Sequence, residues 1–152
     1  MRLWNPPLVL PWQCHSPSVD TSLAVFKKND ISSDEFRARA LELIASYRGY
    51  VQIYTDGSET SHGVGCSFIQ GHERRSFSLP ALASVFTSEL VAILKAVCYI
   101  EVTYGDKPHA IFSDSLSSLT ALKTYDPSSS LVQDILLHLH DLHRNGRNVT
   151  FC

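Results

Sequence analysis

The sequence predicts an α/β fold built around one mixed β-sheet, on the basis of three observations. Strand-like segments joined by short connections follow one another between residues 50 and 79, which is typical of an antiparallel meander. A long apolar helical pattern and a short apolar strand then alternate, as they do where helices connect parallel strands. The chain has 152 residues, of which 44% are hydrophobic, and this is enough for one core without disulfide bonds.

Residues 1–31 are predicted to form a Pro- and aromatic-rich connector. Prolines recur through this stretch and interrupt both helices and strands. Its prolines and large aromatic side chains are Pro6, Pro7, Pro11, Pro17, Trp4, Trp12 and Phe26. We expect this arm to pack on a neighbouring surface, either the body of the chain or an upstream domain.

Residues 32–49 are predicted to form a lead-in helix. Ser32 and Glu35 stand three positions apart, which is the spacing of a capping box, and Gly49 ends the pattern. The apolar side chains on one face of this helix are Phe36, Ala40, Leu43, Ile44 and Tyr47.

Residues 50–152 are predicted to form the main domain, with a five-stranded sheet and flanking helices. The first strand is expected to end at the Asp-Gly-Ser turn of residues 56–58. The expected strands are 50–55, 62–69, a third around Phe77 and Leu79, 109–114 and 147–152. The expected helices are 86–103, 116–122 with an end at Asp126-Pro127, and 131–142 with an end at Asn145-Gly146. The helix over 86–103 is apolar nearly all round, which predicts deep burial.

Charge and composition exclude several classes of protein. The formal net charge is −2, so no overall basic character indicates nucleic-acid binding. No stretch approaches the roughly 18 apolar residues of a membrane span, and the early prolines argue against a signal peptide. The cysteines are Cys14, Cys66, Cys98 and Cys152. Their wide spacing favours free thiols in a reducing, intracellular compartment, with cytoplasm and nucleus both open.

Three acidic residues stand in apolar surroundings that are unusual for surface charges. Asp56 follows the first strand of the sheet, Glu89 lies on the apolar helix, and Asp114 ends the fourth strand. If the first and fourth strands are parallel neighbours, Asp56 and Asp114 meet at one end of the sheet, within reach of Glu89. Three carboxylates without a matching Lys or Arg suit a hard divalent cation such as Mg²⁺.

Each acid also has a purely structural interpretation. Asp56 and Gly57 are a common turn pair, and Glu89 in a first helical turn is favoured by the helix dipole. Asp114-Ser115 is a common pair at the N-cap of a helix. The residues alone leave both interpretations open for each acid.

The motifs around these acids resemble those of the type 1 ribonuclease H family. They are Ile53-Tyr54-Thr55-Asp56-Gly57-Ser58, Phe86-Thr87-Ser88-Glu89-Leu90-Val91-Ala92-Ile93 and Ile111-Phe112-Ser113-Asp114-Ser115-Leu116-Ser117-Ser118-Leu119. They are most similar to those of the ribonuclease H domain found beside the reverse transcriptase of non-LTR retrotransposons. The resemblance covers about residues 50–152.

The resemblance implies a ribonuclease H-like fold and an endonuclease that hydrolyses the RNA strand of an RNA–DNA hybrid. Asp56, Glu89 and Asp114 match the first three acids of a four-carboxylate centre, which holds two Mg²⁺ ions in the family and for which Mn²⁺ is a second candidate. The matched positions near the substrate backbone are Gly57, Ser58, Thr87, Ser88 and Ser115. The implied partners are the hybrid and an upstream reverse transcriptase domain, without a membrane.

The departure from the family lies at the C-terminal side. Family members continue with a catalytic His, a fourth acid and a closing helix, so the domain is expected to be incomplete here. A catalytically inactive remnant that binds nucleic acid or a protein is therefore the alternative to an active nuclease. His138, His140 and His143 precede this point, and their spacing predicts a helix surface, with an unrelated zinc site as the alternative.

Other enzyme classes fit the sequence less well. An integrase-like nuclease of the wider fold would share the three acids, but the Thr-Asp-Gly-Ser and Asp-Ser-Leu motifs favour ribonuclease H. The chain has no GxSxG motif for serine hydrolase chemistry and no P-loop.

Overall fold

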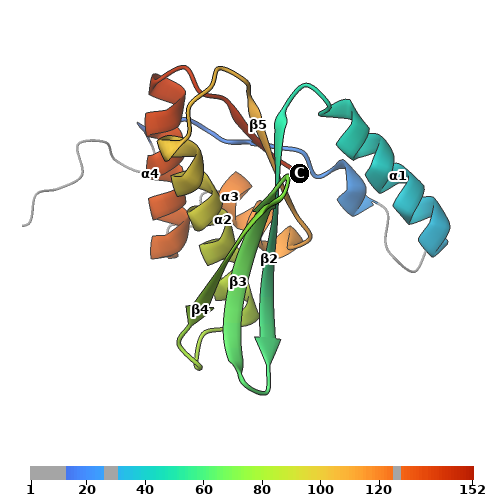
Figure 1. Cartoon of the computed structure of the whole chain (residues 1–152), viewed down its shortest axis with the longest axis vertical. Helices are drawn as coiled ribbons and strands as arrows, with labels where there is room; N and C mark the ends of the chain where they lie inside the picture. Colours follow the sequence, from blue (N-terminus) through green and yellow to red (C-terminus); the bar gives the residue numbers. More distant parts are fainter. Residues whose placement is uncertain (1–12, 26–30, 125–127) are drawn as a thin grey trace, which may run out of the picture.

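The computed structural model describes residues 13–25, 31–124 and 128–152, and over these residues one mixed sheet is flanked by four α-helices (Figure 1). The strands are β1 (Ser18–Val19), β2 (Val51–Thr60), β3 (Gly63–Gln70), β4 (Glu73–Leu79), β5 (His109–Ser113) and β6 (Val149–Phe151). The helices are α1 (Ser33–Ser46), α2 (Val85–Val102), α3 (Leu116–Thr124) and α4 (Ser130–Arg144), with a 3₁₀ turn at Ser22–Val25. The predicted α/β class is confirmed.

The sheet has the strand order β1-β6-β5-β2-β3-β4. The strands β2, β3 and β4 pair antiparallel, which confirms the predicted meander. The strand β5 lies parallel to β2 on one side and to β6 on the other. The connections between the parallel strands contain α2, α3 and α4, as expected of crossovers.

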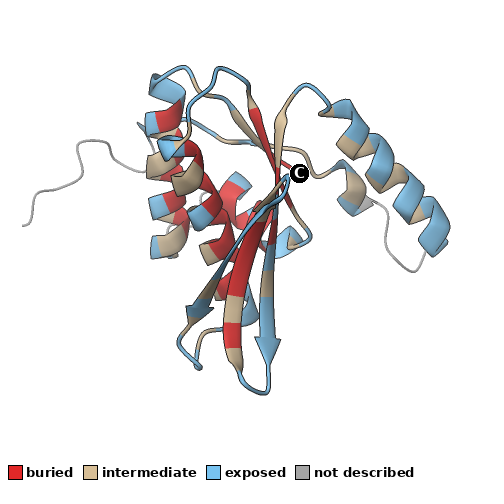
Figure 2. Ribbon diagram, in the orientation of Figure 1, coloured by how far each residue is buried: buried red, intermediate tan, exposed pale blue. Residues whose placement is uncertain are grey.

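The main core lies between the sheet and the helices α2, α3 and α4 (Figure 2). Ile53 and Ile111, from neighbouring strands, and Phe151 from β6 are completely buried there. Burial of each such side chain contributes about 1.5–3 kcal/mol. Eight of the 18 residues of α2 are buried, so the predicted deep burial holds for part of this helix and not all round it.

The opposite face of the sheet carries a smaller cluster around Phe112 and Cys152. Leu43, Ile44 and Tyr47, at the end of α1 and just beyond it, pack against this cluster. The rest of α1 is exposed, and none of its residues is fully buried (Figure 2). The predicted cap is present, because the Ser32 hydroxyl accepts a hydrogen bond from the Glu35 backbone N–H at 3.2 Å.

The predicted end of the first strand at residues 56–58 is wrong. The strand β2 continues to Thr60, and Asp56 lies opposite Ser67 of β3. The reversal comes at residues 61–62, because β3 supplies hydrogen-bonding partners along the whole extension. Asp-Gly-Ser therefore lies inside a long hairpin and does not form the turn between its strands.

A sixth strand, β1, replaces the expected edge of a five-stranded sheet. Ser18 and Val19 pair in parallel with Thr150 and Phe151, and the Asp20 backbone N–H donates to the Phe151 carbonyl at 2.7 Å. A two-residue strand has no periodicity to detect, and Pro17 stands just before it, where a missing N–H is tolerated at a sheet edge. Part of the predicted connector lies outside the described residues, namely Pro6, Pro7, Pro11, Trp4, Trp12 and Phe26, as do Asp126 and Pro127.

The other predicted elements agree with the structure to within a few residues at each end, as is usual for such boundaries. The helix α4 ends at Asn145, and Gly146 follows with a φ of 73°, a left-handed conformation that favours glycine. All four cysteines are free thiols. Among the described residues, no helix combines the length and the apolar character needed to span a bilayer.

Candidate metal centre

Asp56 and Asp114 come together because their strands are parallel neighbours. The register of β2 with β5 pairs Thr55 with Ser113, and each Asp is the next residue along its strand. Adjacent strands lie about 4.8 Å apart, so two side chains at the same level are neighbours. The expected meeting of these two acids is therefore observed, but at the end of β5 only, because β2 continues beyond Asp56.

Glu89 reaches the same place from α2. The Ser84 hydroxyl caps this helix by accepting from the Thr87 backbone N–H at 3.0 Å, which fixes where its first turn lies. The helix then passes so close to β2 that a Cβ on Gly57 would lie 2.7 Å from the Glu89 backbone nitrogen. Only glycine permits this approach, which brings the Glu89 carboxylate close to those of Asp56 and Asp114.

The three acids form one cluster. One carboxylate oxygen from each of Asp56, Glu89 and Asp114 lies within 4.8 Å of the others. Glu89 is buried, with 6% of its surface exposed, whereas Asp56 and Asp114 are exposed. No Lys or Arg forms an ion pair with these acids in the described part of the chain. Like charges at this separation repel one another and are stable only with a cation or a proton between them.

Glu89 has the most perturbed environment of the three acids. Burial and the charges of Asp114 and Asp56 raise the pKa of its carboxyl from 4.5 to about 7, against an opposing hydrogen bond from the Gly57 backbone N–H. Its Oε2 atom is buried and has no hydrogen-bond partner. A buried carboxylate oxygen without a partner is costly, so this atom is suited to accept a cation.

These observations fit a divalent cation that prefers oxygen ligands. The donors are three carboxylates, one of them with an unpartnered buried oxygen, and two of them open to solvent that would complete the coordination. Mg²⁺ is bound in this way, by a few carboxylates while it keeps several waters. The absence of sulfur and nitrogen donors in this cluster argues against a softer metal at this position.

The structural interpretation of Asp56 as a turn residue is wrong, whereas the predicted helix start at Asp114-Ser115 is observed. Asp56 lies within β2 and not in a turn. The cap of α3 is Ser115, whose hydroxyl accepts from the Ser118 backbone N–H at 3.3 Å and contacts the Ser118 hydroxyl at 2.8 Å. The Asp114 side chain is therefore not needed to start the helix.

The residues expected near a substrate backbone divide into two groups. Ser58 is exposed, and Thr87 and Ser115 are partly exposed at the rim of the acid cluster. Gly57 is half-buried against α2. Ser88 is completely buried, and its hydroxyl donates to the Val85 carbonyl at 2.7 Å, so it supports the helix and offers no surface to a substrate.

The described residues contain one further group with metal-ligand geometry, which the sequence analysis did not assemble. It consists of Cys98 and Glu101 from α2 and His138 from α4. The pair on α2 is three residues apart, a signal visible in the sequence, but its partner depends on how the two helices pack.

Comparison of the chain with protein-family models and with curated proteins gives no match.

Proposed function

We propose that this chain is a metal-dependent nuclease of the ribonuclease H type, which hydrolyses the RNA strand of an RNA–DNA hybrid. The observation that carries the proposal is the convergence of Asp56, Glu89 and Asp114 where β5 ends beside its longer parallel neighbour β2. The motifs around these acids, quoted above, supply the reaction and the substrate class. The order of an antiparallel meander followed by helical crossovers supports the same assignment.

The three acids would hold the metal. Asp56 and Asp114, which are exposed, lie where a phosphodiester can approach from solvent, and Glu89 closes the buried side of the cluster. Bound Mg²⁺ supplies an activated water and stabilises the oxygen that leaves in phosphodiester hydrolysis. Gly57 positions Glu89 by letting α2 approach β2, and its N–H orients the Glu89 carboxylate.

The polar groups at the rim suit contacts with the backbone of the RNA strand. The hydroxyls of Ser58 and Thr87 lie on the two elements that flank the cluster, and Ser115 follows Asp114 directly. Hydroxyl groups donate to and accept from a ribose 2′-OH, which is the group that distinguishes RNA from DNA. Hydrolysis is therefore expected on the RNA strand and not on a DNA duplex.

The test is hydrolysis of an end-labelled RNA–DNA hybrid by the 152-residue chain with Mg²⁺. We expect cleavage of the RNA strand and none of the same sequence as a DNA duplex. The change Asp56→Asn keeps the size of the side chain and removes a ligand charge. It should lower the rate at least about 100-fold, which corresponds to the loss of roughly 3 kcal/mol of transition-state stabilisation.

The matched control is Asp106→Asn, an exposed acid in the loop before β5 and outside the cluster. It should leave the rate unchanged. If the folded chain cleaves no hybrid with Mg²⁺ or Mn²⁺, or if Asp56→Asn and Asp106→Asn cleave equally, the nuclease proposal is wrong.

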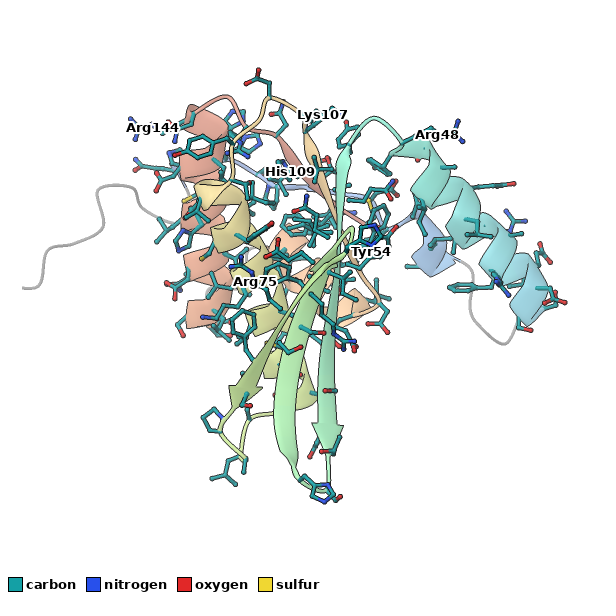
Figure 3. All side chains as sticks on the ribbon, in the orientation of Figure 1. Arg48, Tyr54, Arg75, Lys107, His109 and Arg144 are labelled. Atoms are coloured by element: carbon teal, nitrogen blue, oxygen red, sulfur yellow. The ribbon has the colours of Figure 1, made fainter. Side chains whose placement is uncertain are left out.

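A second candidate is a hybrid-binding module without cleavage, and one observation favours it. Only three acids converge in the described residues, one fewer than the four-carboxylate centre that the resemblance implies. Basic side chains are also dispersed: Arg48, Lys107 and Arg144 lie along one end of the molecule, whereas Arg75 lies on β4 (Figure 3). Binding without cleavage, with an affinity that falls steeply as salt rises, would establish this alternative.

A further inference from the structure

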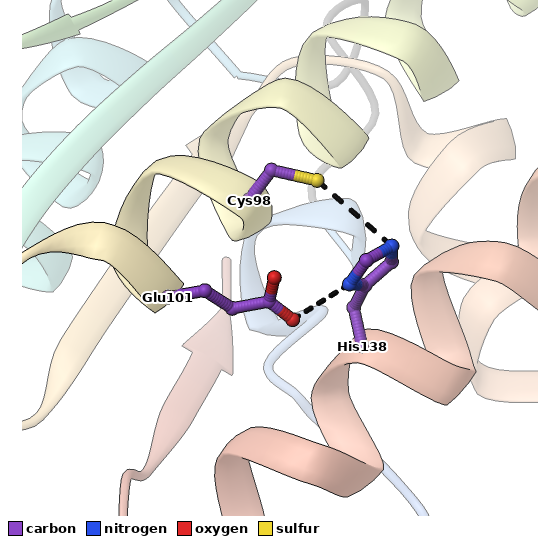
Figure 4. A group of neighbouring side chains, drawn as sticks. All are labelled: Cys98, Glu101 and His138. Carbon is purple, nitrogen blue, oxygen red and sulfur yellow. Dashed lines mark hydrogen bonds and ion pairs between the residues drawn. The ribbon is translucent and has the colours of Figure 1, made fainter.

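A second cluster of metal-ligand side chains lies on the seam between α2 and α4 (Figure 4). The His138 ring stands between two neighbours, with Nδ1 2.6 Å from a Glu101 oxygen and Nε2 4.0 Å from the Cys98 sulfur. One donor atom from each of the three residues lies within 4.8 Å of the other two. The arrangement joins two helices that are otherwise held by apolar contacts.

The two helices fix the cluster before any ligand arrives. Cys98 and Glu101 are three residues apart on α2, so they project from the same face of the helix. His138 faces them because Ile135 and Leu139, its neighbours on α4, are buried in the core and set the rotation of that helix. The donors thus come from two rigid elements, which is how protein metal sites achieve precise geometry.

We propose that Cys98, Glu101 and His138 form a Zn²⁺ site that clips α2 to α4. The donor set of a thiolate, a carboxylate and an imidazole is the mixture that Zn²⁺ accepts, and a hard ion such as Mg²⁺ does not favour it. A thiolate and a carboxylate together balance the two charges of the ion. The ion would bind Nε2 of His138, on the side of Cys98, and the Glu101 carboxylate would turn from Nδ1 toward the ion to become the third ligand.

The distance between the Cys98 and His138 ligand atoms is already close to that of a shared ion. Zn–S and Zn–N bonds of about 2.3 and 2.1 Å at a tetrahedral angle place the two ligand atoms about 3.6 Å apart. The observed separation of Cys98 Sγ and His138 Nε2 is 4.0 Å. The side chains of His138 and Glu101 are 38% and 29% exposed, so His138 is free to adjust by a few tenths of an ångström and Glu101 is free to rotate toward the ion.

The cluster is open to solvent on one side. Glu101 and His138 line a polar hollow together with Asp141, Arg144 and Asn145. An ion can enter from this side, and water can occupy the fourth coordination position. The whole cluster is also distant from the acid cluster. Cys98 and Glu101 lie more than two helical turns beyond Glu89, or roughly 13 Å or more along α2.

A cysteine nucleophile with a His–Glu pair would show the same order of contacts, but two features argue against it. Cys98 lies in the interior of α2, where the backbone N–H groups are used by the helix and cannot stabilise an oxyanion. Burial and the neighbouring Glu101 also raise the pKa of the Cys98 thiol, whereas a nucleophilic cysteine needs a lowered one. A metal site is the better interpretation.

The experiment titrates the metal-free chain with Zn²⁺ while Mg²⁺ is kept in large excess to occupy the acid cluster. We expect Zn²⁺ to raise the Tm by several degrees, because a ligand that binds only the folded state stabilises it. Titration with Co²⁺ should give a sulfur-to-cobalt charge-transfer band, which reports directly on a cysteine ligand. Isothermal titration should give one Zn²⁺ ion per chain.

The variants Cys98→Ser and His138→Gln should each weaken Zn²⁺ binding at least about tenfold and abolish the Tm shift, and Cys98→Ser should also remove the cobalt band. His140→Gln is the matched control, because it removes a histidine from the same helix but outside the cluster. It should bind Zn²⁺ as the unaltered chain does. Circular dichroism of each metal-free variant checks that it is folded.

Two outcomes would overturn the proposal. One is a folded chain that gives neither a Tm shift with Zn²⁺ nor a thiolate band with Co²⁺. The other is binding that persists in Cys98→Ser and His138→Gln but is lost in His140→Gln, which would place the ion elsewhere on α4. Neither outcome bears on cleavage of a hybrid, so the nuclease proposal is tested separately.

Discussion

The two clusters of metal-ligand side chains on α2 differ in whether their carboxylates have a basic side-chain partner. At the start of the helix, three carboxylates meet without a basic partner, and one of them keeps a buried, unpartnered oxygen. Near the end of the helix, Glu101 is paired with His138 at 2.6 Å and both are partly exposed. The first cluster is destabilised until a cation or a proton arrives, whereas the carboxylate of the second cluster already has a hydrogen-bonding partner. The comparison shows that ligand spacing alone does not indicate how strongly a site needs its metal.

The largest expected effect is the pH dependence of the acid cluster in the metal-free protein. The pKa of Glu89 is raised to about 7 in the folded state from 4.5, so its contribution to stability is fully present below pH 4.5 and is lost as the pH rises through 7. The loss is at most about 3 kcal/mol. Urea unfolding between pH 4.5 and 8 in EDTA measures it.

The variant Glu89→Gln isolates this contribution, because it has the same size and does not titrate. The difference in unfolding free energy between the two proteins should change with pH in the stated direction. Mg²⁺, which binds the carboxylate form, should stabilise the unaltered chain more at pH 8 than at pH 5 and should have little effect on Glu89→Gln. If the unfolding free energies of the unaltered chain and Glu89→Gln depend on pH in the same way, the burial of Glu89 does not destabilise the acid cluster.

The next effect concerns the close approach of α2 to β2. The change Gly57→Ala places a Cβ against the Glu89 backbone nitrogen and the Ser88 side chain. We expect a loss of about 1–3 kcal/mol in unfolding free energy and a loss of Mg²⁺ binding, because overpacking displaces Glu89. Zn²⁺ binding at the far end of the helix should be retained.

Gly49→Ala is the control for this substitution. A Cβ at Gly49 meets nothing within 4 Å, and its backbone is not in the left-handed region. Its unfolding free energy should stay within about 0.5 kcal/mol of the unaltered chain. Equal effects of Gly57→Ala and Gly49→Ala would contradict the role of Gly57 as the contact point.

A smaller effect on stability is expected to distinguish substitutions of Asp114 from those of its neighbour Ser115. Ser115→Ala removes the cap of α3 and should cost about 1 kcal/mol in unfolding free energy. Asp114→Asn should leave metal-free stability unchanged or slightly raised, because it relieves repulsion from Glu89. Chemical denaturation of both variants in EDTA measures the two effects, and the opposite ranking would make Asp114 the cap after all.

The smallest effect is expected at the seam between α2 and α4. Without metal, Glu101→Gln should cost about 0.5 kcal/mol, because exposed ion pairs contribute little. The measurement is the same unfolding experiment in EDTA. A cost above about 2 kcal/mol would mean that this pair, and not the metal, holds the helices together.

The sequence was sufficient for the acids and for most of the fold. Periodicity locates the helices and strands, and apolar neighbours in the sequence single out Asp56, Glu89 and Asp114, of which only Glu89 is buried in the structure. The convergence of these acids also follows from pattern, since a helical crossover makes β2 and β5 parallel. The family assignment remains a prediction for the hydrolysis assay.

What the sequence could not predict depends on contacts between distant segments. The extension of β2 through Asp-Gly-Ser requires the partner strand β3 to override a local turn preference. Ser88 is buried because α2 approaches Gly57 closely, and the residues next to Ser88 in the sequence do not predict this contact. Whether a histidine of α4 faces Cys98 depends on how α4 is rotated against α2. The sequence pattern of His138, His140 and His143 does not determine this rotation.

The short strand β1 has a consequence for the order of folding. It pairs with β6, so the two ends of the described chain form adjacent strands. The N-terminal arm leaves the ribosome before β6 has been synthesised, so β1 cannot pair until then. In that interval the edge of β5 that β6 will cover is also unpaired and open to other strands.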